Sequence, residues 1–136
     1  MTKNNISKLS AYWIKASEID ASTARDIFEN TTKYVTVLFH IHLAIEKILK
    51  AAYVTRKKEH APYSHNLLYL AKSAEIDLSD DYIKFLSEVN EFNLECRYPD
   101  EKFSIYKKAN KRFAEKYLKS MEKFREWISE RLKKEQ

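Results

Sequence analysis

The sequence predicts an all-α protein: a single domain, residues 1–136, folded as an antiparallel up-and-down bundle of four long helices and one short helix. Three observations support this prediction. The chain has no glycine and only two prolines, whereas sheet proteins need glycine at turns with positive φ. Hydrophobic residues make up 44% of the chain, which is enough for a core. Apolar residues also recur at intervals of three and four, the period of one helical face.

The first helix is expected over residues 6–28. The residues of its inner face follow helical spacing: Leu9, Trp13, Ala16, Ile19 or Asp20, Ala24, Ile27 and Phe28. Residues 30–32 then form a short turn, in which Thr31 or Thr32 can cap the next helix. Because this turn is so short, we expect the first two helices to be antiparallel.

The second helix is expected from Tyr34 to about Thr55 and should be the spine of the bundle. Its apolar face consists of Leu38, Ile41, Ile45, Ile48 and Ala52. His42, Glu46 and Lys50 repeat every four residues and form a polar line beside that face. We expect this polar line to lie on the wall of a groove.

The segment RKKEHAPYS, residues 56–64, is the clearest loop, because Pro62 disfavours a helical conformation at the residue before it. A short helix is expected over residues 65–76. The fourth helix should begin at Ser79, since a hydroxyl cap followed by two aspartates suits a helix N-terminus. Pro99 ends this helix by about Arg97.

The last helix is expected to start between Asp100 and Ser104 and to run to about Leu132. Its inner stripe consists of Tyr106, Ala109, Phe113, Tyr117 or Leu118, Met121, Phe124, Ile128 and Leu132. Phe124 and Trp127 lie about 60° apart on a helix and cannot be equally buried in one monomer. We therefore expect Trp127 to be partly exposed or to lie in a dimer interface.

The net charge of +5 is concentrated in the last segment. Residues 1–106 carry 14 basic and 15 acidic side chains, whereas residues 107–136 carry 11 basic and 5 acidic ones. One interpretation is attraction to nucleic acid or to another anionic partner. The other is a solvated helix face that carries Glu–Lys pairs.

Several classes of protein are excluded or disfavoured by the composition. Without glycine the chain has no phosphate-binding P-loop and no dinucleotide-binding fingerprint. Cys96 is the only cysteine, so neither an internal disulfide nor a thiolate metal cluster is expected. His40 and His42 point to opposite sides of a helix and cannot share a metal. We expect no metal, no cofactor and no membrane span, and a cytoplasmic protein.

Three clusters contain the candidate binding residues. On the spine, Glu46 and Lys50 either form a structural ion pair below His42 or face a ligand. His65 and Asn66 lie at a loop-to-helix junction, where they either bind an anion or cap the helix.

The third cluster is Arg97-Tyr98-Pro99-Asp100. Arg97 either binds phosphate with both arms of its guanidinium, beside Tyr98 as a stacking surface, or stabilises the helix C-terminus. No arrangement typical of nucleophilic catalysis is visible, because Ser64 and His65 are merely adjacent in sequence.

Together these blocks resemble the HEPN family (higher eukaryotes and prokaryotes nucleotide-binding). The resemblance rests on FHIHLAIEKILKA from Phe39 to Ala51, on Pro62 with SHNL from Ser64 to Leu67, and on CRYPD from Cys96 to Asp100. Trp13-Ile14-Lys15-Ala16 with Asp20 is similar to the start of the family's first helix.

The resemblance implies a helical bundle that is often a homodimer. It also implies a partner, since small prokaryotic HEPN proteins are commonly paired with a minimal nucleotidyltransferase in toxin–antitoxin-like modules. Many members are metal-independent RNases, with an arginine, a polar residue and then a histidine after four to six residues. Here the corresponding positions after Arg97 are Lys102, Phe103 and Ser104. Without that histidine the resemblance favours the nucleotide-binding, Arg-Tyr-Pro branch.

These observations lead to three hypotheses. In the first, a non-catalytic module binds a nucleotide or nucleic acid through Lys50, His65, Asn66, Arg97 and Tyr98, supported by His42 and Glu46. In the second, the protein is an RNase toxin that uses His42 or His65 with Arg97 across a dimer. In the third, it is a structural partner of a nucleotidyltransferase and binds no ligand.

Overall fold

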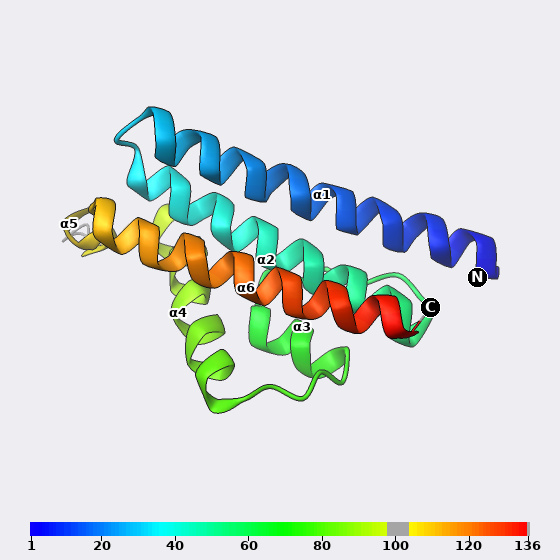
Figure 1. Cartoon of the computed structure of the whole chain (residues 1–136). Helices are drawn as coiled ribbons and strands as arrows, with labels where there is room; N and C mark the ends of the chain where they lie inside the picture. The colour runs from blue at the N-terminus through cyan, green and yellow to red at the C-terminus, as the bar shows by residue number, and fades with distance from the viewer. Residues whose placement is uncertain (98–103, 136) are drawn as a thin grey trace.

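The computed structural model describes residues 1–97 and 104–135. These residues form six helices and no strand: α1 (Lys3–Asn30), α2 (Tyr34–Lys57), α3 (Leu67–Ser73), α4 (Asp80–Arg97), α5 (Ser104–Lys108) and α6 (Lys111–Glu135). The helices pack as a bundle, which confirms the predicted all-α class (Figure 1). No helix in the described part of the chain is long and apolar enough to span a lipid bilayer.

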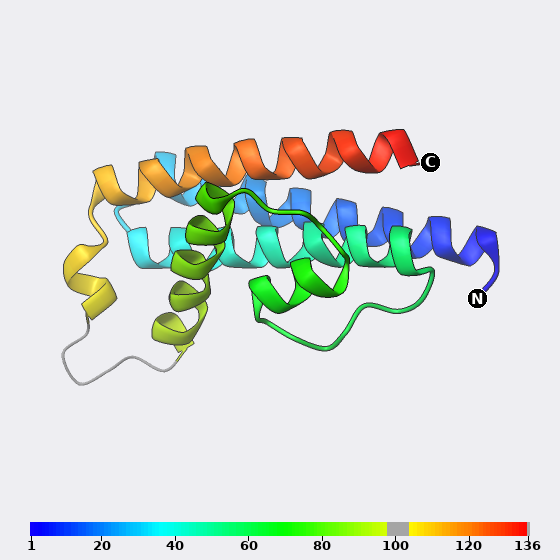
Figure 2. The same ribbon diagram turned by 90° about the horizontal axis from the view of Figure 1, so that it is seen from below.

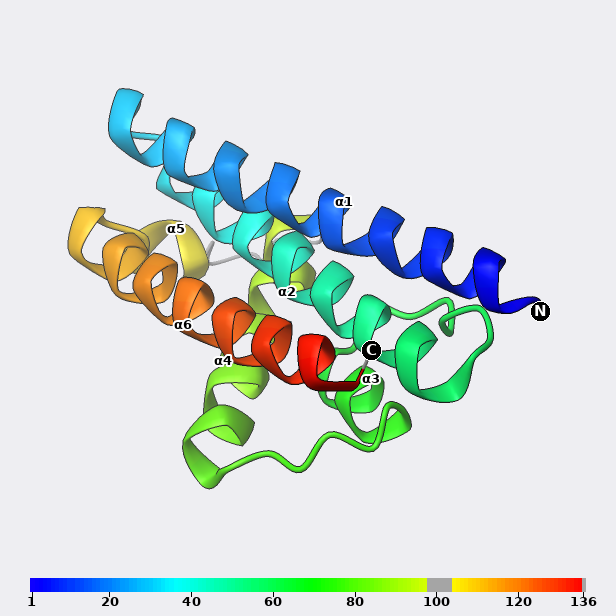
Figure 3. The same cartoon turned by 45° about the vertical axis from the view of Figure 1, so that its right-hand side comes forward.

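Helix α2 is the spine of the bundle, as its sequence predicts. It contacts α1, α3, α4 and α6. Figure 2 shows α6 along one side of α2 and α3 along the other. Helix α1 is antiparallel to α2, whereas α6 runs in the same direction as α2 because α4 crosses the bundle steeply between them (Figure 1). The two chain termini therefore lie at the same end of the molecule (Figure 3).

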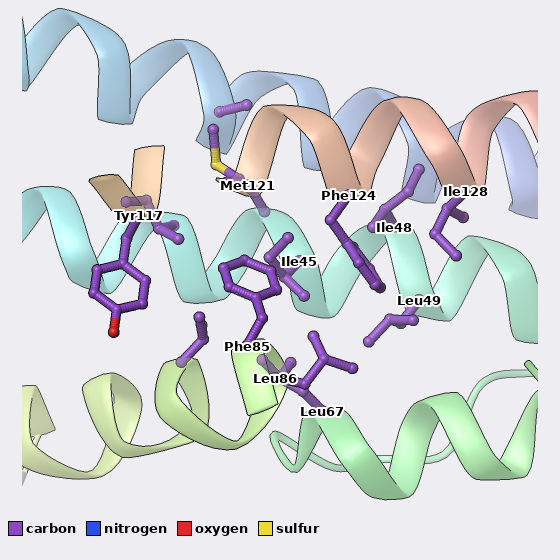
Figure 4. Packing of buried hydrophobic residues seen from close by; sticks show 14 of the residues in the cluster. Ile45, Ile48, Leu49, Leu67, Phe85, Leu86, Tyr117, Met121, Phe124 and Ile128 are labelled. Carbon is purple, nitrogen blue, oxygen red and sulfur yellow. The ribbon is translucent and has the colours of Figure 1, made fainter. Parts of the chain in front are cut away.

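The core lies between α2, α4 and α6. Figure 4 shows Met121, Phe124 and Ile128 of α6 in one cluster with Ile45 and Ile48 of α2. These five side chains are almost completely buried. The apolar faces predicted for α2 and α6 are thus the faces that pack together, because each buries a continuous line of apolar side chains.

The predicted last helix is divided in two, which corrects the sequence prediction. Helix α5 ends at Lys108, and α6 begins at Lys111 after a break at Ala109 and Asn110. The Asn110 side chain accepts a hydrogen bond from the backbone N–H of Phe113 at 2.9 Å. Such a cap starts a new helix instead of continuing the previous one. The described side chains of the predicted inner stripe are buried or partly buried.

Two turns use the left-handed conformation without glycine. Lys58 follows the last turn of α2 with φ 58°, and Glu75 follows α3 with φ 57°. This conformation costs a residue with a Cβ atom about 1–2 kcal/mol. Helix α3 is also shorter than predicted. Asn66 has an extended backbone and caps the N-terminus of α3, so the helix begins at Leu67. Glu75, with its positive φ, ends the turn that follows the helix.

Trp127 is partly exposed, as predicted. Its indole lies 4.7 Å from the ring of Tyr82 and 5.8 Å from the ring of Phe124, measured between ring centres. The guanidinium of Arg131 covers it at 5.0 Å. These contacts within one chain account for its burial, and the dimer interface stays a prediction.

Candidate functional site

Glu46 is the centre of the polar line on α2. Its carboxylate is buried, with the residue only 4% exposed. One oxygen, Oε1, accepts a hydrogen bond from Nδ1 of His65 at 2.7 Å. The other, Oε2, accepts from Nζ of Lys50 at 3.2 Å. A buried carboxylate is stable only when it is paired in this way, so Glu46 joins α2 to the loop before α3.

His42 is completely buried one turn before Glu46. Its Nε2 lies 2.9 Å from the backbone oxygen of His65 and donates to it, since a carbonyl oxygen can only accept. Its Nδ1 lies 3.9 Å from Oε1 of Glu46. His65 is therefore held twice by α2, through its backbone by His42 and through its ring by Glu46.

Lys50 lies on the inner part of the same line. The residue is 6% exposed, and its Nζ lies over the ring of Trp13 from α1 at 5.1 Å. With Glu46 on one side and the indole on the other, its charge is satisfied inside the protein. The sequence left two interpretations of Lys50, a structural ion pair with Glu46 or a residue that faces a ligand. The geometry of Lys50 in the structure is that of the ion pair.

His65 brings this buried network to the surface. Its side chain is 39% exposed, and the ring packs against Tyr63 with 6.0 Å between ring centres. Tyr63 itself is almost fully exposed. Among the described residues, Nε2 of His65 has no hydrogen-bond partner. An imidazole held at Nδ1 by a carboxylate can donate or accept at Nε2 with a defined orientation.

Asn66 caps α3 and connects it to α4. Its Oδ1 accepts from the backbone N–H of Tyr69 at 3.2 Å and from Nδ2 of Asn90 at 3.1 Å. Oδ1 of Asn90 in turn accepts from the backbone N–H of Leu67 at 2.8 Å. Sequence reasoning missed Asn90, although an amide at an inward register position of an apolar helix was an available signal.

Arg97 is the last residue of α4, but its side chain and Tyr98 lie outside the described residues. The backbone of α4 reaches position 97 seven residues beyond Asn90. Seven residues are two turns, or about 10 Å, and return the helix to the same register. Position 97 therefore lies on the same side of α4 as Asn90, two turns further along the helix. Asn90 is the residue that contacts Asn66 and the start of α3.

A second polar cluster lies on the other side of α2. His40 bonds to Asp20 of α1, with 3.1 Å between Nδ1 and Oδ1, and Lys47 pairs with the second oxygen of Asp20. The prediction that His40 and His42 point to opposite sides is confirmed. In the described part of the chain, no three metal-binding side chains of the histidine, cysteine or carboxylate type lie close enough to hold an ion.

Comparison with known proteins now adds to this geometry. The HEPN domain family matches residues 10–132, nearly the whole chain. The chain belongs to the HEPN family. The resemblance inferred from the three sequence blocks is therefore confirmed. A search of curated proteins gives no match.

Among solved structures, this HEPN domain is similar to the crystal structure of TT1696 from Thermus thermophilus. The TM-score is 0.75 at 17% sequence identity, over 89% of this chain and 96% of that one. At this identity the likeness shows a shared fold.

Proposed function

We propose that this HEPN domain is a non-catalytic module that binds a nucleotide or nucleic acid at the surface around His65. The observation that carries the proposal is the anchoring of His65. A completely buried histidine holds its backbone, a buried glutamate holds its ring, and the ring edge is exposed. A protein that places two buried polar groups behind one surface side chain orients that side chain for a ligand.

The neighbouring residues suit a phosphate and a base. His65 offers Nε2 to a phosphate oxygen, and Tyr63 offers an exposed ring for stacking. Asn66 and Asn90 fix the start of α3 against α4. Arg97 then adds a bidentate phosphate contact, and Tyr98 a second stacking face. In this arrangement Lys50, His42 and Glu46 support the site from inside.

Family membership supports the second part of the proposal, the partner. We infer that the domain acts with a minimal nucleotidyltransferase in a toxin–antitoxin-like pair, as a homodimer. Co-purification of the tagged protein with the product of an adjacent nucleotidyltransferase gene tests the pairing. If the two proteins, produced together, elute separately at all concentrations, this part of the proposal fails.

Calorimetric titration with mononucleotides tests the binding site. Replacing His65 with alanine should weaken binding at least about tenfold, the loss expected for one charge-assisted hydrogen bond. His60→Ala is the matched control, because His60 is exposed in the same loop. An unchanged affinity for mononucleotides in His65→Ala, or no heat with any mononucleotide for the unaltered protein, contradicts the proposal.

A second candidate function, metal-independent RNA cleavage, is favoured by the same Glu46–His65 contact. Of the two candidate histidines, only His65 can serve as the base that contacts RNA, because His42 is completely buried. Nε2 of His65 takes the proton of a 2′-hydroxyl, the 2′ oxygen bonds to phosphorus, and the 5′ oxygen leaves and is protonated by water. Incubation of RNA with pure protein and a chelator tests this candidate. RNA that stays intact removes it, whereas cleavage that stops in both His65→Ala and Arg97→Ala supports it.

A further inference from the structure

A second feature, separate from the His65 surface, is a line of basic side chains on α6. Arg112, Lys116, Lys119 and Lys123 are all exposed. Their spacing of four, three and four residues puts them within about 60° of one another around the helix, over about 16 Å of its length. We call these four residues the basic stripe.

Most of the charge on the basic stripe is not compensated. Lys119 pairs with Glu115 at 3.2 Å, and both side chains are open to solvent. Arg112, Lys116 and Lys123 form no ion pair with any residue that the structure describes. By contrast, Arg125 in the same helix pairs with Glu18 of α1. The Glu–Lys interpretation of the basic segment thus holds for one member of the stripe, and three cations remain for an external anion.

A hollow of about 470 Å³ lies at the start of the stripe. It is lined by Lys108, Asn110, Arg112, Phe113 and Lys116. Phe113 is half-buried, so part of its ring faces this hollow among three cations. The volume is within the range of small-molecule sites, and the combination of an aromatic face with cations suits a base and its phosphates.

We propose that single-stranded nucleic acid binds along the basic stripe, with its phosphates on Arg112, Lys116 and Lys123 and one base stacked on Phe113. An unpaired base is needed, because a base inside a duplex cannot enter the hollow. The stripe belongs to α6, which lies on the side of α2 away from α3 (Figure 2), whereas His65 belongs to the loop just before α3. This binding surface goes beyond the proposed function, because the stripe shares no residue with the surface around His65.

The surroundings of the stripe favour nucleic acid over an anionic membrane. A helix that lies on a membrane carries large apolar side chains next to its cations. The large apolar residues of α6 instead point into the core, where Met121, Phe124 and Ile128 are fully buried.

Fluorescence anisotropy with a labelled, unstructured 12-nucleotide RNA at several salt concentrations tests the stripe. The triple variant Arg112→Gln, Lys116→Gln, Lys123→Gln should bind at least about tenfold more weakly, with the slope of log affinity against log salt smaller by about two. The matched control is Lys3→Gln, Lys8→Gln, Lys15→Gln, which removes the same charge from exposed positions of α1. Its affinity should change much less. Equal losses in the two triple variants, or no loss in the first, overturn the proposal.

Phe113→Leu tests the base-stacking part. Affinity should fall several-fold while the salt slope stays the same, because stacking releases no counterions. Phe113 also packs on Phe92 and Tyr117, so thermal unfolding must first show that the variant is folded. A changed salt slope, or an unchanged affinity in the folded variant, contradicts this contact.

Two further arms separate the possible outcomes. His65→Ala should lose nucleotide binding but retain binding of the labelled RNA on the stripe, so that the two sites can fail separately. Vesicles of phosphatidylcholine with and without phosphatidylserine test the membrane. Binding to the anionic vesicles without binding to RNA overturns the proposal.

Discussion

The buried Nε2 of His42 lies 2.9 Å from the backbone oxygen of His65, a residue 23 positions further along the chain. This bond fixes the end of the loop between α2 and α3 against the spine helix. His42 is the first residue of the polar line on α2. The next residue of that line, Glu46, accepts a hydrogen bond from the ring of His65. Stability and the geometry of the candidate site therefore depend on the same few groups.

Replacing His42 with phenylalanine should release this loop. The change keeps an aromatic ring in the core but leaves the His65 oxygen without its donor, which costs about 1–3 kcal/mol. Chemical denaturation measures the loss, and amide hydrogen exchange over residues 58–66 shows where it occurs. His60→Phe, at an exposed position of the same loop, should change neither. Unchanged exchange in the loop of His42→Phe would contradict this role.

Glu46→Gln should destabilise the protein by about 2–4 kcal/mol, because it leaves Lys50 charged and buried without its counterion. The double variant with Lys50→Met should recover part of this loss, since the unpaired charge is removed. Glu115→Gln is the control, because its pair with Lys119 is exposed and contributes less than about 1 kcal/mol. Urea denaturation of the unaltered protein, Glu46→Gln, Lys50→Met and the double variant gives the coupling energy, and a value near zero would show that the buried pair is not coupled.

Asp20 should make stability depend on acid pH. Burial raises the pKa of Asp20, but hydrogen bonds and charges from His40 and Lys47 outweigh burial and bring it below its ordinary value of 3.8. The folded state thus binds this proton less readily than the unfolded state. The stabilisation is complete above the unfolded pKa and is lost as the pH falls through the lower folded value.

Asp20→Asn tests this dependence. The variant should be less stable than the unaltered protein at pH 7, because it loses the negative charge that pairs with Lys47, and the difference should shrink below about pH 4. Asp26→Asn, at an exposed position of α1, is the control. Urea denaturation across the acid range measures both, and a difference that stays constant with pH would exclude titration of Asp20 as the cause.

Lys58→Gly should stabilise the protein by about 0.5–1 kcal/mol. Lys58 has φ 58° at the C-terminus of α2, and glycine takes this conformation without steric cost. The same substitution within a helix should do the opposite, so Lys123→Gly in α6 should cost about 1 kcal/mol. Thermal unfolding measures both. A loss of stability in Lys58→Gly would mean that the lysine side chain contributes more than the backbone conformation costs.

Much of the fold and part of the candidate site could be predicted from the amino-acid sequence. The absence of glycine and the three-and-four spacing of apolar residues identified the helices, because these are local properties of the chain. The same spacing placed His42, Glu46 and Lys50 on one line and His40 on the opposite side. Asn110 was the exception, since its capping of α6 competes with an otherwise continuous helical pattern.

Only the tertiary structure decided what those residues do. Periodicity determines which side of a helix a residue occupies, but burial depends on which distant segment packs there. Trp13 and the loop at His65 cover Lys50 and Glu46, so a line that resembled the wall of a groove became a buried network. The exposed end of this network is His65, because the loop before α3 packs against α2 there.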